Sequence, residues 1–244
     1  MPPVLLTKRI EFAAAHRYLR PEWDEAKNRA VFGLCYNPPA HGHNYLLEVT
    51  VSGEVDRHTG MVINLFDLKR VLLTVIEEFD HRNLNLDMPY FKDQIPTSEN
   101  LARVLWTRLA AQKDIGTLHA IRLYEDEDLY TDVTAASGLE TASVTKRYTF
   151  PALRTGHPAP TWDWFVTIHG RIDPLTGMVV DLRMLDRSVQ TTMDELCDHH
   201  KVENLPTPDF IKSVWERLNT SIHGNTLTKV RLVHNRDLTL EYSG

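Results

Sequence analysis

The sequence is poor in cysteine, containing only Cys35 and Cys197, so no disulfide framework is expected and a cytoplasmic location is predicted. It lacks any apolar run near the roughly 20 residues of a membrane helix, and its first residues lack the pattern of a signal peptide. Positive charge is not in excess either, because the net charge is −6. We therefore expect neither a membrane nor a nucleic acid as partner. Hydrophobic residues make up 42% of the chain, which is typical of a globular protein.

Two stretches, residues 53–70 and 170–187, repeat each other about half the chain length apart. Both carry a glycine, an aspartate, the tetrapeptide Thr-Gly-Met-Val and a final arginine at the same places. An apolar, strand-like run precedes each stretch, at residues 45–51 and 164–168. A repeat of this length predicts two copies of one structural unit.

The regions after the repeats also correspond. Each half continues with a helix-like stretch (65–79 and 182–196), an Asp-His pair, a second helix opened by Thr97-Ser98-Glu99 or Thr207-Pro208-Asp209, and a strand (119–124 and 229–233). Apolar residues at i, i+3 and i+4 predict the second helices, and a serine or aspartate before such a run is a typical N-cap.

Each half thus follows the order strand, strand, helix, helix, strand, strand. The prediction is an α+β fold of two tandem units, each an antiparallel four-stranded sheet with two helices on one face. Residues 135–138 form the expected linker, between a catalytic domain at 1–134 and a second domain at 143–244.

Three histidines of the first half predict a metal site. His41 and His43 flank Gly42 at the start of a predicted strand, where side chains two residues apart point the same way. An isolated His-x-His pair is more often structural. His16, in a separate apolar run, supplies a third imidazole, and three neutral imidazoles leave one tetrahedral position open, as in a catalytic zinc site.

Further candidate groups have two interpretations each. Cys35 is either a buried small hydrophobe or a thiol whose pKa is lowered beside a cation. Asp80 either caps a helix end or orients the imidazole of His81. Glu125 either belongs to a solvated acidic turn or forms two parallel hydrogen bonds with a guanidine-like heterocycle.

Together these residues, with Pro96-Thr97-Ser98-Glu99, resemble the 6-pyruvoyl tetrahydropterin synthase / 6-carboxytetrahydropterin synthase family, from about Lys8 to Val133. The resemblance implies the tunnelling fold, duplicated in tandem, and a lyase acting on 7,8-dihydroneopterin triphosphate with a Zn²⁺ cofactor. The loop between Cys35 and His41 resembles that of the pyruvoyl-forming type.

The resemblance also implies a role for each matching residue. The zinc ligands are His16, His41 and His43, and the catalytic groups are Cys35, Asp80 and His81. The substrate-binding residues are Thr97, Ser98, Glu99 and Glu125, of which Glu125 anchors the pterin ring.

The second half keeps the repeated scaffold but departs at the site. It lacks the segment that carries the cysteine and the His-Gly-His, Arg154 stands where His16 would be, and His234 replaces Glu125. Only one zinc site per chain is therefore predicted. The pair Asp198-His199 is either a relic of a helix end or part of a neighbouring chain's site.

Several outcomes stay open at this point. The product is 6-pyruvoyl or 6-carboxy tetrahydropterin. Alternatively, the chain is a related pterin enzyme that cleaves the dihydroneopterin side chain, or a pterin-binding scaffold without activity. In the family that the sequence resembles, active sites form where subunits meet. We therefore expect a homo-oligomer, either a trimer of tandem chains that mimics a hexamer or a dimer or tetramer.

Overall fold

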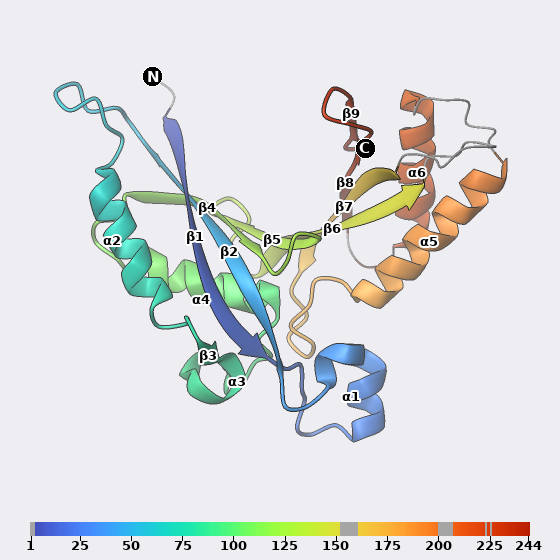
Figure 1. Ribbon diagram of the computed structural model, residues 1–244, viewed down its shortest axis with the longest axis horizontal. Helices are drawn as coiled ribbons and strands as arrows, with labels where there is room; N and C mark the ends of the chain where they lie inside the picture. The colour runs from blue at the N-terminus through green and yellow to red at the C-terminus, as the bar shows by residue number, and fades with distance from the viewer. Residues whose placement is uncertain (1–2, 152–160, 200–206, 223, 225) are drawn as a thin grey trace. The chain divides into compact units, whose positions relative to one another are not determined.

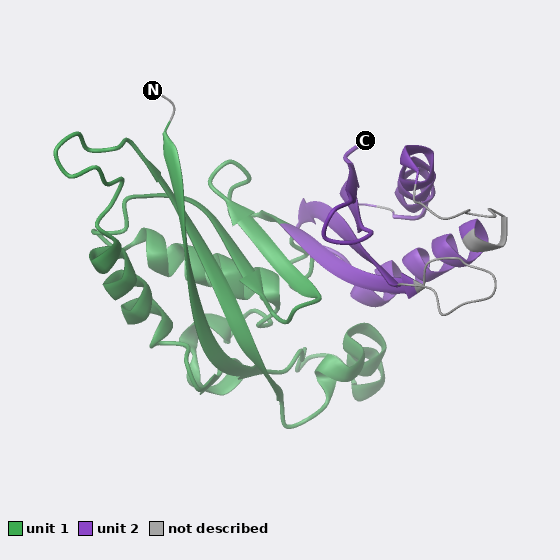
Figure 2. Cartoon of the chain, turned by 45° about the horizontal axis from the view of Figure 1, so that its top comes forward, with its two compact units in different colours: residues 1–142, 172–178 green, residues 143–171, 179–244 purple. Residues whose placement is uncertain are grey.

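The structure is a computed structural model that describes residues 3–151, 161–199, 207–222, 224 and 226–244 (Figure 1). The chain forms two compact units (Figure 2). Unit 1 comprises Met1–Ala142 and Ile172–Met178, and unit 2 comprises Ser143–Arg171 and Val179–Gly244. A short loop of the second sequence copy is therefore part of unit 1.

The sheet of unit 1 has the strand order β3-β1-β2-β4-β5. Its strands are β1 (Val4–His16), β2 (His41–Gly53), β3 (Arg82–Asn83), β4 (Thr117–Tyr124) and β5 (Leu129–Thr134). The four long strands pair antiparallel, as predicted, and the two-residue β3 adds a parallel edge to β1. Sequence periodicity did not predict β3, because two residues are too short for a pattern.

Helices cover the sheet of unit 1 on its apolar face (Figure 1). The helices that cover this face are α2 (Leu65–Ile76) and α4 (Ser98–Ala110). Unit 1 also contains the shorter helices α1 (Glu25–Phe32), η1 (Gly33–Tyr36), α3 (Leu84–Asp87) and η2 (Pro89–Phe91). The sheet's buried face includes Tyr45, Leu47 and Val49, which alternate along β2. Each such fully buried side chain contributes about 1.5–3 kcal/mol to folding.

Unit 2 repeats this arrangement with the strand order β6-β7-β8-β9. Its elements are β6 (Thr141–Pro151, beginning at the boundary between the units), β7 (Thr161–Arg171), α5 (Leu182–His199), α6 (Pro208–Ser221), β8 (Thr226–Val233) and β9 (Thr239–Tyr242). The register of β2 on β4 shifts between Thr50 and Val51, and that of β7 on β8 shifts between Thr167 and Ile168. These are equivalent positions, so the repeat extends to an irregularity of the sheet.

The predicted α+β fold and the order of its elements are confirmed. The N-cap prediction was wrong, because Thr97 and Thr207, not the following serine or aspartate, cap α4 and α6 with their hydroxyls. The helix predicted at 65–79 ends earlier, at Ile76. Arg154 lies outside the described residues, as do the side chains of Asp198 and His199. Among the described helices, none has both the length and the apolar character needed to cross a membrane.

Candidate metal centre and active site

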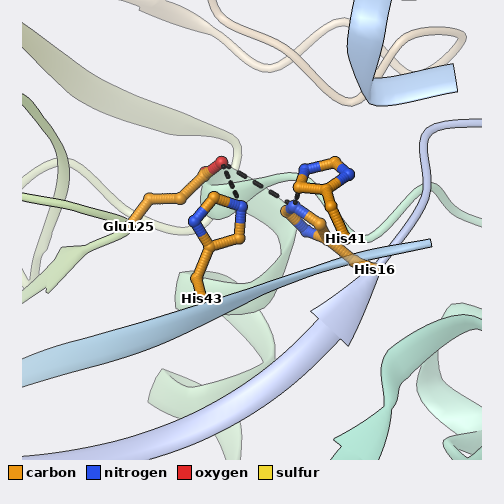
Figure 3. Close-up of side chains that lie close together, drawn as sticks. All are labelled: His16, His41, His43 and Glu125. Carbon is orange, nitrogen blue, oxygen red and sulfur yellow. Dashed lines mark hydrogen bonds and ion pairs between the residues drawn. The ribbon is translucent and has the colours of Figure 1, made fainter. Parts of the chain in front are cut away.

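Three imidazoles meet on the buried face of the β1–β2 ribbon (Figure 3). His16, the last residue of β1, lies opposite His41 in the register, and His43 lies opposite Ala14. Alternation along both strands places the three side chains on the same face. Their ring centroids are 4.6 Å (His16–His41), 4.9 Å (His16–His43) and 5.0 Å (His41–His43) apart.

Glu125 completes this group from the end of β4. Its Oε1 lies 3.4 Å from Nε2 of His43 and 3.7 Å from Nε2 of His16 (Figure 3). One ligand atom from each of His16, His41, His43 and Glu125 lies within 4.8 Å of the other three, so these four residues could hold a metal ion. Among the residues that the structure describes, this group lies in unit 1.

The backbone fixes the tautomer of His16. Its Nδ1 lies 2.8 Å from the carbonyl oxygen of Pro96. Because a carbonyl only accepts hydrogen bonds, Nδ1 carries the proton and donates it. The Nε2 lone pair then faces the group, 3.0 Å from Nε2 of His41. A hydrogen bond of this kind on the far nitrogen is typical of histidines that bind metals.

Burial keeps the three imidazoles neutral. It lowers the pKa of His16 to about 3, with the neighbouring His41 and His43 adding to the effect. Burial also lowers the pKa of His41 and, together with the charge of His41, that of His43. Metal ions bind the neutral form of histidine, so these ligands need not lose protons near pH 7.

The pKa of Glu125 is shifted upward, whereas those of the histidines are lowered. Burial, followed by the charges of Glu99 and Asp126, raises its pKa to about 8. Its Oε2 and Nε2 of His43 are buried atoms without a hydrogen-bond partner. Such atoms are costly unless a ligand or an ion satisfies them, so the donor set fits a bound cation or a hydrogen-bonding heterocycle.

Cys35 lies on the same face as the histidines. It belongs to η1 and packs against the buried cluster of Tyr18, Phe32 and Ile95. The amide of Tyr18 donates to its carbonyl oxygen at 2.8 Å, which ties η1 to the chain just beyond β1. Burial raises the pKa of Tyr18, and the charges of Glu125, Glu99 and Cys35 contribute, so these groups share one environment.

Asp80 and His81 are fixed to the edge of β1 by both hydrogen-bonding groups of one residue. Asp80 Oδ1 accepts from the amide of Ala13 at 2.8 Å, and the amide of His81 donates to the Ala13 carbonyl at 2.6 Å. Asp80 Oδ2 lies 3.0 Å from Nδ1 of His81. The hydrogen bond from Ala13 chiefly lowers the pKa of Asp80. His81 has a φ of 58°, a left-handed conformation uncommon outside glycine and often found at functional sites.

The pocket beside His81 opens on the other face of the sheet. It measures about 410 Å³ and is lined by residues 13–15, 42–44 and 81–83. In the β1–β2 register Ala13 pairs with Asn44, and these partners point away from the face of His16 and Cys35. The structure thus brings the histidines and Glu125 together, places Cys35 in the adjoining cluster around Tyr18, and places His81 elsewhere.

The start of α4 is buried beside Glu125. Thr97, Ser98 and Glu99 are at most 5% exposed, and the charge of Glu99 contributes to the raised pKa of Glu125. Ser98 shares a hydrogen bond of 2.9 Å with the hydroxyl of Thr131. The Thr97 hydroxyl accepts from the amide of Asn100 and donates to the carbonyl of Gly177, so it is committed to protein contacts.

Sequence patterns missed two neighbours of the histidines. The hydroxyl of Tyr45 lies 3.1 Å from Nδ1 of His16, and the ring of Tyr18 lies 5.0 Å from that of His16. Their spacing was the available signal, because His43 and Tyr45, and likewise His16 and Tyr18, are two residues apart. In unit 2, the position of Glu125 is taken by His234, whose ring lies 5.5 Å from Trp162.

Comparisons with known proteins find relatives for about half of the chain. The chain is 41% identical over 124 residues to the 6-pyruvoyl tetrahydrobiopterin synthase of Homo sapiens, covering 50% of this chain and 86% of that protein. A solved structure of 6-pyruvoyl tetrahydropterin synthase from Caenorhabditis elegans superposes with a TM-score of 0.53 at 34% identity, covering 55% of this chain and 97% of that one. The dihydroneopterin monophosphate aldolase of Pyrococcus furiosus is 36% identical over 107 residues, or 44% of this chain and 74% of that protein.

The family model of 6-pyruvoyl tetrahydropterin synthase matches two segments of the chain, residues 5–136 and 154–244. The two segments correspond to the two sequence copies, so both carry the tunnelling fold. The chain therefore belongs to the 6-pyruvoyl tetrahydropterin synthase family, lyases that act in pterin synthesis.

Proposed function

We propose that the chain converts 7,8-dihydroneopterin triphosphate to 6-pyruvoyl tetrahydropterin, with a zinc ion held by His16, His41 and His43. The main support for this proposal is that three neutral imidazoles and Glu125 lie together on one buried face. Imidazole ligands suit zinc, and a set of three leaves a position for substrate. The similarity to the human 6-pyruvoyl tetrahydrobiopterin synthase, at 41% identity over 124 residues, supports the choice of product.

The metal ion and the proton-transfer residues have separate chemical roles in the proposed reaction. The zinc ion would supply Lewis acidity to the hydroxyls of the substrate side chain. The thiol of Cys35 and the Asp80–His81 pair move protons at the side-chain carbons as general acids and bases. The reaction eliminates triphosphate and shifts electrons within the substrate, from side chain to ring, so it requires no external oxidant.

Glu125 and Glu99 are proposed to bind the pterin ring. Glu125 is buried, and its Oε2 has no hydrogen-bond partner within the described part of the chain. A pterin offers an amino group and an adjacent ring N–H, which a carboxylate accepts in parallel. The proposed assignment leaves the histidines as the metal ligands and gives Glu125 the task of orienting the ring.

The proposed active site needs more than one chain. Cys35 lies on the histidine face of the β1–β2 ribbon, whereas His81 lines the pocket on the other face. We propose that a homo-oligomer brings His81 of one chain to Cys35 of another. A trimer of tandem chains, a dimer or a tetramer would each satisfy this requirement.

Incubation of the zinc-loaded protein with 7,8-dihydroneopterin triphosphate, with mass spectrometry of the products, tests the proposal. We expect 6-pyruvoyl tetrahydropterin and inorganic triphosphate. Cys35→Ala should retain zinc and lose turnover by at least about 100-fold, the usual contribution of a positioned acid or base. A 6-carboxy product would correct the side-chain outcome, and absence of any turnover would contradict the substrate.

Cleavage of the dihydroneopterin side chain is the second candidate. The similarity to the Pyrococcus furiosus aldolase favours it, because that protein shares 36% identity over 107 residues. A shortened side chain on the pterin product, from a mono- or triphosphate substrate, would identify this activity in the same experiment.

A further inference from the structure

The loop Asp173–Met178 belongs to the second sequence copy but forms part of unit 1 (Figure 2). Its counterpart in the first copy is Asp56–Met61. Both loops close with the same hydrogen bonds, since the amide of Gly177 donates to Asp173 at 2.7 Å and that of Gly60 donates to Asp56 at 2.8 Å. The φ angles of the two glycines are 74° and 69°. The two loops therefore share one backbone conformation.

The surroundings of the two loops differ. A Cβ on Gly177 would lie 2.6 Å from Nδ2 of Asn100 and 3.1 Å from Cγ2 of Thr97. A Cβ on Gly60 would meet nothing within 4 Å. Met61 is 42% exposed, whereas Met178 packs against the buried cluster of Tyr18, Phe32 and Ile95. Only the second-copy loop is thus seated against the start of α4.

Polar contacts hold this loop from two sides. The Thr97 hydroxyl donates to the carbonyl of Gly177 at 2.6 Å. The guanidinium of Arg20 donates to the carbonyl of Pro174 at 2.6 Å and to that of Leu175. Charge-assisted bonds to backbone carbonyls are stronger than neutral ones, so Arg20 fixes the outer end of the loop.

The loop is connected to His16 through two adjacent residues, Pro96 and Thr97. Thr97, which binds Gly177, directly follows Pro96, whose carbonyl accepts the Nδ1 proton of His16 at 2.8 Å. The ring of Tyr18, in the cluster that Met178 contacts, lies 5.0 Å from that of His16. The loop therefore contacts the residue next to Pro96, whose carbonyl sets the tautomer of His16. It also packs against the cluster that contains Tyr18, whose ring flanks the imidazole.

We propose that Asp173–Met178 is a positioning element for His16, holding the Pro96 carbonyl so that Nε2 of His16 faces the metal group. The second copy would then serve the first within the same chain, beyond any role in assembly. This inference rests on the proposed function only in taking His16 as a metal ligand.

Gly177→Ala tests the proposal, with Gly60→Ala as the matched control. Both variants place a side chain at the same positive φ, but only Gly177→Ala pushes against Thr97 and Asn100. Titration of the metal-depleted chain with cobalt(II) should show an affinity loss of about 10- to 100-fold for Gly177→Ala, the usual effect of disturbing the partners of a ligand. Gly60→Ala should stay close to wild type.

Nitrogen-15 NMR of the metal-depleted chain gives an independent readout. Wild type and Gly60→Ala should show His16 protonated at Nδ1 alone, and Gly177→Ala should show a mixture of tautomers. Arg20→Gln releases the loop without adding bulk and should shift both readouts in the same direction, with Arg20→Lys recovering part of the loss. This pair serves if Gly177→Ala does not fold.

The outcomes separate the two proposals. Equal cobalt affinity and equal His16 tautomers in wild type, Gly177→Ala and Arg20→Gln would overturn the positioning role. A wild-type chain that binds no cobalt would contradict the proposed function instead, and the NMR comparison would still decide the role of the loop.

Discussion

At the scale of single residues, one buried face carries a base whose pKa is lowered and an acid whose pKa is raised. Burial lowers the pKa of His16 to about 3 and raises that of Glu125 to about 8. Both shifts favour the uncharged form, as expected where water is excluded. A cation would reverse the preference of Glu125, because a nearby positive charge favours the carboxylate.

Glu125 should make the stability of the metal-free chain depend on pH. Its pKa is about 8 when folded and 4.5 in the reference state, so between these values the folded chain binds a proton that the unfolded chain lacks. Its contribution is complete below pH 4.5 and is lost as the pH rises through 8, by up to about 5 kcal/mol. His16, with a lowered pKa, contributes above pH 6.5 and loses its contribution as the pH falls towards 3.

Urea unfolding of metal-free wild type and Glu125→Gln between pH 5 and 9 measures this effect. The His16 contribution is common to both chains and cancels in the difference. We expect wild type to lose stability relative to Glu125→Gln as the pH rises. Parallel curves over this range would contradict the raised pKa.

At the scale of elements, the two copies begin their last helix in the same way but in different surroundings. Thr97 caps α4 and Thr207 caps α6, each through its hydroxyl. Thr97 is fully buried and also donates to Gly177, whereas Thr207 is exposed. The same cap is therefore worth more in the first copy.

Replacement of each cap by alanine measures this difference. Thr207→Ala should cost about 1 kcal/mol, the usual value of an N-cap. Thr97→Ala should cost about 2–3 kcal/mol, because the buried carbonyl of Gly177 also loses its donor. Urea unfolding of both variants provides the comparison, and equal costs would show that the contact with Gly177 adds no stability.

Much of the architecture follows from local patterns in the sequence. The apolar run that begins at Tyr45 and the helical spacing of Leu101 and Leu105 predicted main elements, each of which buries one face. No local sequence pattern predicts the contact between Gly177 and Thr97, because these residues are far apart in the sequence. The opposite faces of Cys35 and His81 likewise depend on the β1–β2 register, which a linear motif does not reveal.

At the scale of the whole molecule, the candidate catalytic groups are divided between two faces of one sheet. Cys35 and His16 share the buried face, and His81 lines the pocket on the other. If chains combine to form each site, two different inactive chains should complement each other.

Mixed oligomers test this division. Cys35→Ala and His81→Ala should each lose at least about 100-fold in activity. Oligomers refolded from an equal mixture should recover part of the wild-type rate, because some sites receive intact residues from both chains. A mixture of Cys35→Ala and His16→Ala should recover none, since both residues lie on the same face of one chain. Equal recovery in the two mixtures would contradict sites shared in this way.

The zinc content per chain tests the central claim most directly. Elemental analysis for zinc, after zinc loading and dialysis, should give one ion per wild-type chain and almost none in His16→Ala. His234→Ala, at the position in unit 2 that corresponds to Glu125, should keep its zinc. Two ions per wild-type chain, or none, would contradict a single metal centre formed by His16, His41 and His43.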